Sequence, residues 1–235
     1  YENAEKIILC LSGFISAIGT VMLPKVSRMT RMKQMDAVKR HIRLSMELVM
    51  CMVCAMAFGL AAVAVNFAPL FYGDDFAYSG TLMMPLAFTL LSIGFANVIR
   101  TQWVLPQGRD TIFVHSVLTG AVINLIANFV LIPPFGAMGA AAATVLAEFS
   151  VPAVQFVYLR KELPYAQYLK TTGVYCLFGL VMAGAVVLLG HVLPLHGWGK
   201  LAVQVTGGAA VYGALCLTYW KLAKRSDIFR LMRRK

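Results

Sequence analysis

The chain has 235 residues, of which 60% are hydrophobic and 13% charged, and its mean hydropathy is +0.74. A soluble domain carries roughly 25% charged residues, so this composition excludes an ordinary water-soluble globular protein. The formal net charge of +11 does not indicate a nucleic-acid partner, because the basic residues lie at the ends of apolar stretches and not on one face with aromatic residues. We expect them to contact anionic lipids.

Seven apolar stretches are each long enough to cross the hydrocarbon core of a bilayer, which takes about 20 helical residues. We predict spans over residues 5–24, 45–68, 80–104, 112–132, 136–159, 171–193 and 199–221. Open strands are excluded because lipid cannot satisfy their backbone edges. The predicted fold class is therefore all-α, a polytopic transmembrane helical bundle of about seven spans that forms a single transmembrane domain over residues 1–235.

Lys and Arg residues gather in alternate gaps between these spans. The gap 25–43 holds seven basic residues and only one acid, Asp36, whereas the gap 69–80 holds no basic residue. Because short basic loops are retained on the cytoplasmic side, we predict that the basic gaps and the C-terminus are cytoplasmic. The gap 25–43 is predicted to contain an amphipathic helix on the membrane surface, with Thr30 as its N-cap, and residues 222–235 to form a basic cytoplasmic tail.

Five cysteines fall inside the predicted spans, where a thiol behaves as a small hydrophobic group. Cys51 and Cys54 have the CxxC spacing of a redox or zinc motif, but no second pair of ligands follows them. Neither a metal site nor a disulfide framework is expected.

Three polar residues lie inside predicted spans, where lipid disfavours polar side chains. Glu148 is twelve residues into its span, about 18 Å at 1.5 Å per residue, and a carboxylate at that depth must be protonated, paired or hydrated. It indicates a transport or proton-coupling group, or alternatively a protonated group that bonds a neighbouring helix. Asn124 and Asn128 share one helical face, where their amides suit either sugar hydroxyls or contacts between helices.

The third span carries a cationic group near its predicted cytoplasmic end. Arg100 follows Asn97 by about one helical turn, and Gln102 comes just after it. The planar guanidinium suits phosphate oxygens, although snorkelling to lipid headgroups is an alternative explanation. Lys6 lies near the outer end of the first span and faces either a cavity or headgroups.

Several segments, in this order, resemble the C-terminal half of bacterial polysaccharide repeat-unit flippases. They are YENAEKI at 1–7, GTVMLPKVS at 19–27, NVIRTQ at 97–102, LPQGRD at 105–110, GAVINLIAN at 120–128 and LIPPFGAMGAAAATVLAE at 131–148. The resemblance spans roughly residues 1–165. It places the chain in the superfamily that also contains MATE-type multidrug exporters and lipid II flippases.

This resemblance implies a two-lobed helical transporter of the bacterial cytoplasmic membrane. Its members move an undecaprenyl-pyrophosphate-linked oligosaccharide to the outer leaflet by alternating access, coupled to an H⁺ or Na⁺ gradient and without a resident cofactor. The chain would supply the second lobe, and its partners would be the missing N-terminal lobe and the polysaccharide polymerase and assembly proteins. Arg100 or Lys6 would face the pyrophosphate, and the amides of Asn97, Gln102, Asn124, Asn128 and Gln155 would face the glycan.

Three alternatives stay open. The same architecture exports drugs or other lipid-linked precursors, because a fold does not choose its cargo. An intramembrane polymerase or glycan transferase would need a large loop with paired acidic or His residues, whereas the longest gap here is basic and contains only Asp36. A non-transporting assembly scaffold would tolerate Ala at Arg100 and Glu148. We predict a transporter and not an enzyme.

Overall fold

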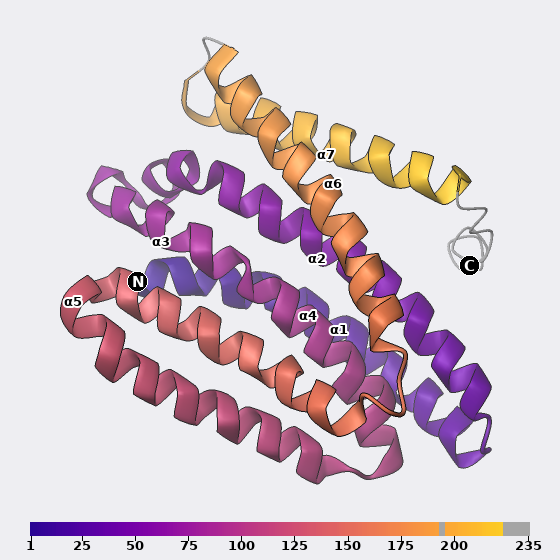
Figure 1. Ribbon diagram of the computed structural model, residues 1–235. Coiled ribbons are helices and arrows are strands. Elements are labelled where there is room, and N and C mark those ends of the chain that lie inside the picture. The colour runs from indigo at the N-terminus through magenta and orange to yellow at the C-terminus, as the bar shows by residue number, and fades with distance from the viewer. Residues whose placement is uncertain (193–195, 223–235) are drawn as a thin grey trace.

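The computed structural model describes residues 1–192 and 196–222, and within them the chain is helical almost throughout. In chain order the elements are α1 (Glu2–Arg31), α2 (Met35–Tyr72), η1 (Asp74–Phe76), α3 (Ala77–Ala87), α4 (Thr89–Ile99), η2 (Arg100–Val104), η3 (Leu105–Gln107), α5 (Asp110–Leu159), α6 (Tyr165–Val192) and α7 (Gly197–Leu222). The helices form one elongated bundle (Figure 1).

Six helical stretches in the described residues are long and apolar enough to cross a membrane. One of them, α5, is a hairpin of two antiparallel helices that reverses at Gly136, whose φ of 56° and ψ of −132° suit glycine alone (Figure 1). Gly139 lies against the backbone carbonyl of Leu131, so the two arms of the hairpin touch closely. The hairpin raises the number of crossing segments to seven, which confirms the predicted bundle.

The span predicted over residues 80–104 is broken and lies at the centre of the bundle. Its first part, α3, ends near Pro85, and a bend at Phe88 leads into α4. The residues from Arg100 to Val104 form a π-helical turn before the short η3. A proline bend and a π turn change which side chains face a given neighbour, so helical spacing alone could not assign the faces of this span.

The long helix α2 joins the two sides of the bundle. It packs against the α3–α4 span on one side and against the α6–α7 pair on the other. The buried residues at this double interface include Val53, Ala57, Leu86 and Leu90. Gly94 of α4 lies against the side chains of Val49 and Val53, which brings α4 close to α2.

The predicted separate surface helix in residues 25–43 is wrong. Thr30 lies inside α1, where its hydroxyl donates to the carbonyl of Val26 at 3.0 Å, so it caps no helix. A turn that includes Lys33 at a φ of 57° leads directly into α2. The apolar residues Val38 and Ile42 face the protein interior and not lipid, with exposed fractions of 1% and 0%. The predicted tail 222–235 lies, beyond Leu222, outside the described residues.

The α1–α2 turn, the loop before α5 and the loop between α5 and α6 lie at the same end of the bundle (Figure 1). We call it the basic end. Four of the cysteines form two contacts between helices: Cys51 with Cys216, and Cys54 with Cys176, each with sulfur atoms 3.7 Å apart. All five cysteines are free thiols.

Candidate functional site

A cavity of about 820 Å³ lies between α1, α4 and the two arms of α5. Five of the seven residues singled out in the sequence line it, although they come from three different helices: Asn97, Arg100, Asn124, Asn128 and Glu148. Gln155 also lines it and is 1% exposed. A polar cavity inside a bundle of apolar helices is where a membrane protein handles a polar ligand.

The wall formed by α5 combines small residues with amides. Gly120 of the first arm lies so close to the second arm that a Cβ there would be 3.3 Å from the carbonyl oxygen of Ala147. Asn128 donates from Nδ2 to Oδ1 of Asn124 at 3.0 Å, which fixes both amides on the cavity wall. Oδ1 of Asn128 is buried and has no hydrogen-bond partner among the described residues, so it remains available to a ligand.

Arg100 lies where α4 passes into the π turn. Its guanidinium carbon is 5.0 Å from the centroid of the Phe113 ring, which orients the planar group by a cation–π contact. Its buried Nε atom has no hydrogen-bond partner in the described part of the chain. The group therefore keeps unused donors for an anion.

Glu148 lies on the second arm of α5 and faces the same cavity. Ser92 of α4 donates a hydrogen bond to the backbone carbonyl of Glu148, which ties this turn of α5 to the central span. Neither of the ion pairs found between described residues involves its side chain. Glu148 thus shares a cavity with Arg100 without being neutralised by it.

Asn97 lines the cavity and also contributes to helix packing. Its Nδ2 donates to the carbonyl of Ile15 at 3.2 Å, and its Oδ1 faces Gly19, where α1 approaches α4 closely. Any side chain at Gly19 would collide with this amide. Part of the hydrogen-bonding capacity of Asn97 is therefore used between helices.

Two of the seven residues singled out in the sequence, Gln102 and Lys6, do not line this cavity. Gln102 is 1% exposed, and its Oε1 lies 3.3 Å from Nδ1 of His41 on α2. It faces away from Arg100 because residues two apart in a helix do not share a face. Lys6 is exposed and pairs with Glu2 at 2.9 Å on the surface of α1.

The sequence analysis missed the contribution of α1 to the cavity. Tyr1, Glu5, Leu9, Ser12 and Ser16 line it, at intervals of three or four residues that place them on one helical face. The hydroxyl of Tyr1 lies 2.8 Å from that of Thr144 on the second arm of α5. The helical spacing of Glu5 with the two serines was the available signal.

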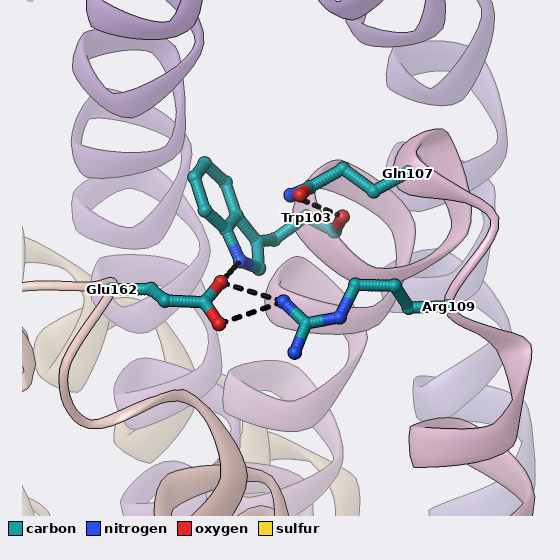
Figure 2. Close-up of polar contacts among 4 residues, drawn as sticks. All are labelled: Trp103, Gln107, Arg109 and Glu162. Carbon is teal, nitrogen blue, oxygen red and sulfur yellow. Dashed lines mark hydrogen bonds and ion pairs between the residues drawn. The ribbon is translucent and has the colours of Figure 1, made fainter.

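A second polar cluster lies at the basic end, outside the apolar core of the spans (Figure 2). Nη1 of Arg109 lies 2.8 Å and 2.6 Å from the two carboxylate oxygens of Glu162, and Trp103 Nε1 donates to Glu162 at 3.0 Å. Partial burial favours the neutral acid, but the hydrogen bonds from Arg109 and Trp103 outweigh it and hold the pKa of Glu162 below its ordinary value. Lys39 lies over the Trp103 ring, 5.7 Å from its centroid.

The fold and the cavity define a multi-pass α-helical membrane protein with polar side chains gathered between its spans. Residues 1–206 match the family model described as lipid II flippase MurJ, and the chain belongs to this family. The family match confirms the expected resemblance to flippases and the expectation of a transporter and not an enzyme.

Known relatives support the same placement. The chain is 22% identical over 220 residues to the probable low-salt glycan biosynthesis flippase Agl15 of Haloferax volcanii, covering 93% of this chain and 46% of that protein. It is 22% identical over 139 residues to a putative O-antigen transporter of Shigella dysenteriae, covering 59% of this chain and 34% of that protein. The chain thus spans about half the length, or less, of these relatives.

A solved structure shows the same fold. The lipid II flippase MurJ in an inward closed conformation superposes with a TM-score of 0.77 at 16% identity, over 93% of this chain and 46% of that chain.

Proposed function

We propose that this chain is the second lobe of a flippase that moves an undecaprenyl-pyrophosphate-linked oligosaccharide across the bacterial cytoplasmic membrane. The observation that carries the proposal is the common location of Arg100, Asn124, Asn128 and Glu148 in one cavity between membrane-spanning helices. The names of the two relatives, a glycan biosynthesis flippase and an O-antigen transporter, favour a glycan over a drug as cargo.

The cavity suits the polar part of such a substrate. A diphosphate that crosses lipid needs compensating positive charge, and Arg100 offers a planar set of donors held beside Phe113. Sugar hydroxyls can donate to the buried amide oxygens of Asn128 and Gln155, which have no partners in the described residues. The volume of about 820 Å³ lies within the range of small-molecule sites. The polyprenyl chain stays in lipid.

Transport by alternating access requires that this lobe moves against the first lobe. The basic end faces the cytoplasm, because the turn between α1 and α2 carries the largest group of Lys and Arg residues. Glu148 is the group that couples transport to an H⁺ or Na⁺ gradient, since a carboxylate at this depth changes its charge or its ligand as access to water changes. Polymerase and assembly proteins of the same glycan are the expected partners.

The test uses the full-length protein with Arg100→Ala and Glu148→Gln made separately. We expect each variant to lower the amount of lipid-linked glycan in the outer leaflet at least about tenfold, the loss that follows from one charged hydrogen bond. Arg160→Ala is the matched control, because Arg160 is an exposed base at the basic end. Normal export by both variants at matched protein levels would exclude both residues from the mechanism.

A further inference from the structure

A second cavity, of about 580 Å³, lies beside the contact between α2 and the α6–α7 pair. It lies between α2, the α3–α4 span, α6 and α7, and it shares no lining residue with the cavity of the proposed transport site. The family resemblance assigned no residue to it, and the proposed transport mechanism makes no use of it.

The polarity of this crevice changes along its length. Its apolar part is lined by residues such as Phe58, Met84, Phe88, Leu180 and Ala183, and its polar part by Asn66, His191, Lys200 and Gln204. From Phe58 to Asn66 the rise along α2 is about 12 Å, and from Leu180 to His191 along α6 it is about 16 Å. One leaflet of the hydrocarbon core is about 15 Å thick, so the crevice has the length of one acyl chain.

The polar end is built from fixed side chains. Gln204 is 2% exposed, donates from Nε2 to the carbonyl of Val186 at 3.1 Å and accepts from Asn66 at 3.4 Å. A Cβ at Gly190 of α6 would lie 2.5 Å from Nε2 of Gln204 and 3.4 Å from Cε of Lys200. The glycine therefore makes room for the Gln204 amide, and the stem of Lys200 lies beside it.

Lys200 and His191 each have a nitrogen atom at this end that has no partner among the described residues. Neither ion pair found between described residues involves Lys200. Nδ1 of His191 donates to the carbonyl of Val187 at 2.8 Å. With the proton on Nδ1, Nε2 is an acceptor that suits a hydroxyl group of a ligand. Lys200 is also unusual in its location, because the other two connections at this end, 69–80 and 133–136, contain no Lys or Arg.

We propose that this crevice binds one anionic phospholipid from the leaflet opposite the basic end. An acyl chain lies beside the Phe58 and Phe88 rings, which contact each other, and against Met84, Leu180 and Ala183. The phosphate lies at Lys200, and a headgroup hydroxyl donates to His191. A lysine is a point charge that binds phosphate, and its placement above an apolar slot matches the order of groups in a phospholipid. A polyprenyl chain is much longer than this crevice, whose length matches one acyl chain, so a bilayer lipid fits better than the carrier lipid.

A lipid in this position has a structural consequence. It fills the space between α2 and the α6–α7 pair, and its headgroup contacts both α6 and α7. The bound lipid therefore stabilises the contact of α6 and α7 with the bundle in the leaflet opposite the basic end, where the crevice lies.

The experiment is native mass spectrometry of the full-length protein in detergent with added phosphatidylglycerol, phosphatidylcholine or undecaprenyl phosphate. We expect one phosphatidylglycerol to be retained at least about tenfold more tightly than phosphatidylcholine. Lys200→Gln should remove this preference, and Ala183→Trp should lower retention of both phospholipids by filling the apolar part. Lys221→Gln, at the other end of α7, is the control and should change nothing.

Three outcomes would overturn the proposal. They are equal retention of the two phospholipids, equal effects of Lys200→Gln and Lys221→Gln, and tight binding of undecaprenyl phosphate without phosphatidylglycerol. Ala183→Trp is interpreted only if its thermal stability matches that of the parent. If Ala183→Trp is destabilised, the test rests on Lys200→Gln, which changes a partly exposed side chain. Glycan export plays no part in these readouts, so failure here is separate from failure of the proposed transport function.

Discussion

Arg109 and Glu162 form an ion pair that joins the two loops on either side of α5. The guanidinium contacts both carboxylate oxygens, and Trp103 adds a third hydrogen bond to the same carboxylate (Figure 2). Because α5 is a hairpin, its first and last residues lie at the same end of the bundle, and this pair closes the hairpin there.

The pair predicts a pH dependence of stability. The pKa of Glu162 is lower in the folded protein than in the unfolded chain, so its contribution is present above the unfolded value of about 4.3 and is lost as the pH falls through the folded pKa. Each partner is about a third exposed, so we expect no more than about 1 kcal/mol, or roughly 2–4 °C in Tm. Thermal unfolding of the full-length protein should show this loss in the parent below about pH 4.5 and not in Glu162→Gln.

A double-mutant cycle checks the partner assignment. Arg109→Ala and Glu162→Ala should each lower Tm at neutral pH, and the double variant should lower it by less than the sum of the two. Strict additivity would mean that the two side chains do not interact.

The hairpin of α5 depends on close contact at Gly139. A Val at this position would place its Cβ against the backbone carbonyl of Leu131, which cannot rotate away, so Gly139→Val should destabilise the protein by about 1–3 kcal/mol. Gly184→Ala is the control, because its surroundings are open and Ala improves helix propensity by about 0.5–1 kcal/mol. Equal Tm values for the two variants would show that the arms are not in contact.

Asn97 and Asn128 should respond differently to substitution. Asn97→Ala removes the hydrogen bond to Ile15 and should lower stability by about 1 kcal/mol, because it joins α1 to α4. Asn128→Ala removes a hydrogen bond only to Asn124, one turn away in the same helix, and an amide oxygen without a partner in the described residues. It should therefore reduce glycan export with a smaller change in Tm than Asn97→Ala. Tm and export are measured on the same membranes. A lower Tm for Asn128→Ala together with reduced export for Asn97→Ala would mean that Asn128 serves helix packing and Asn97 contacts the glycan.

The cavity lining also predicts a contrast within one helical turn. Gln102→Ala should keep glycan export close to the parent level, whereas Arg100→Ala should lose it, because only Arg100 faces the cavity. Loss of export by both variants at equal protein levels would mean that the two residues act on the same face.

Orientation is checked by labelling single cysteines in a cysteine-free background. Lys33→Cys and Lys161→Cys lie at the basic end and should react with a membrane-impermeant maleimide only from the cytoplasmic side. Asp75→Cys, at the opposite end, should react from outside. Labelling of Lys33→Cys and Lys161→Cys from different sides would refute the proposed topology.

The sequence by itself determined that the chain lies in a membrane and how many segments cross it. Apolar length alone predicted seven spans, because it depends only on neighbours in the chain. The same local reasoning put Glu148, Asn124 and Asn128 on candidate faces, since α5 has regular helical periodicity on both sides of Gly136.

Only the tertiary structure decided which polar groups meet. The π turn after Ile99 and the packing of α2 direct Gln102 toward His41, whereas Arg100 faces the cavity with Glu5 and Gln155 from distant helices. The pairing of Arg109 with Glu162 joins residues from two separate loops. Such contacts depend on how whole helices pack against each other, which no pattern within a single span contains.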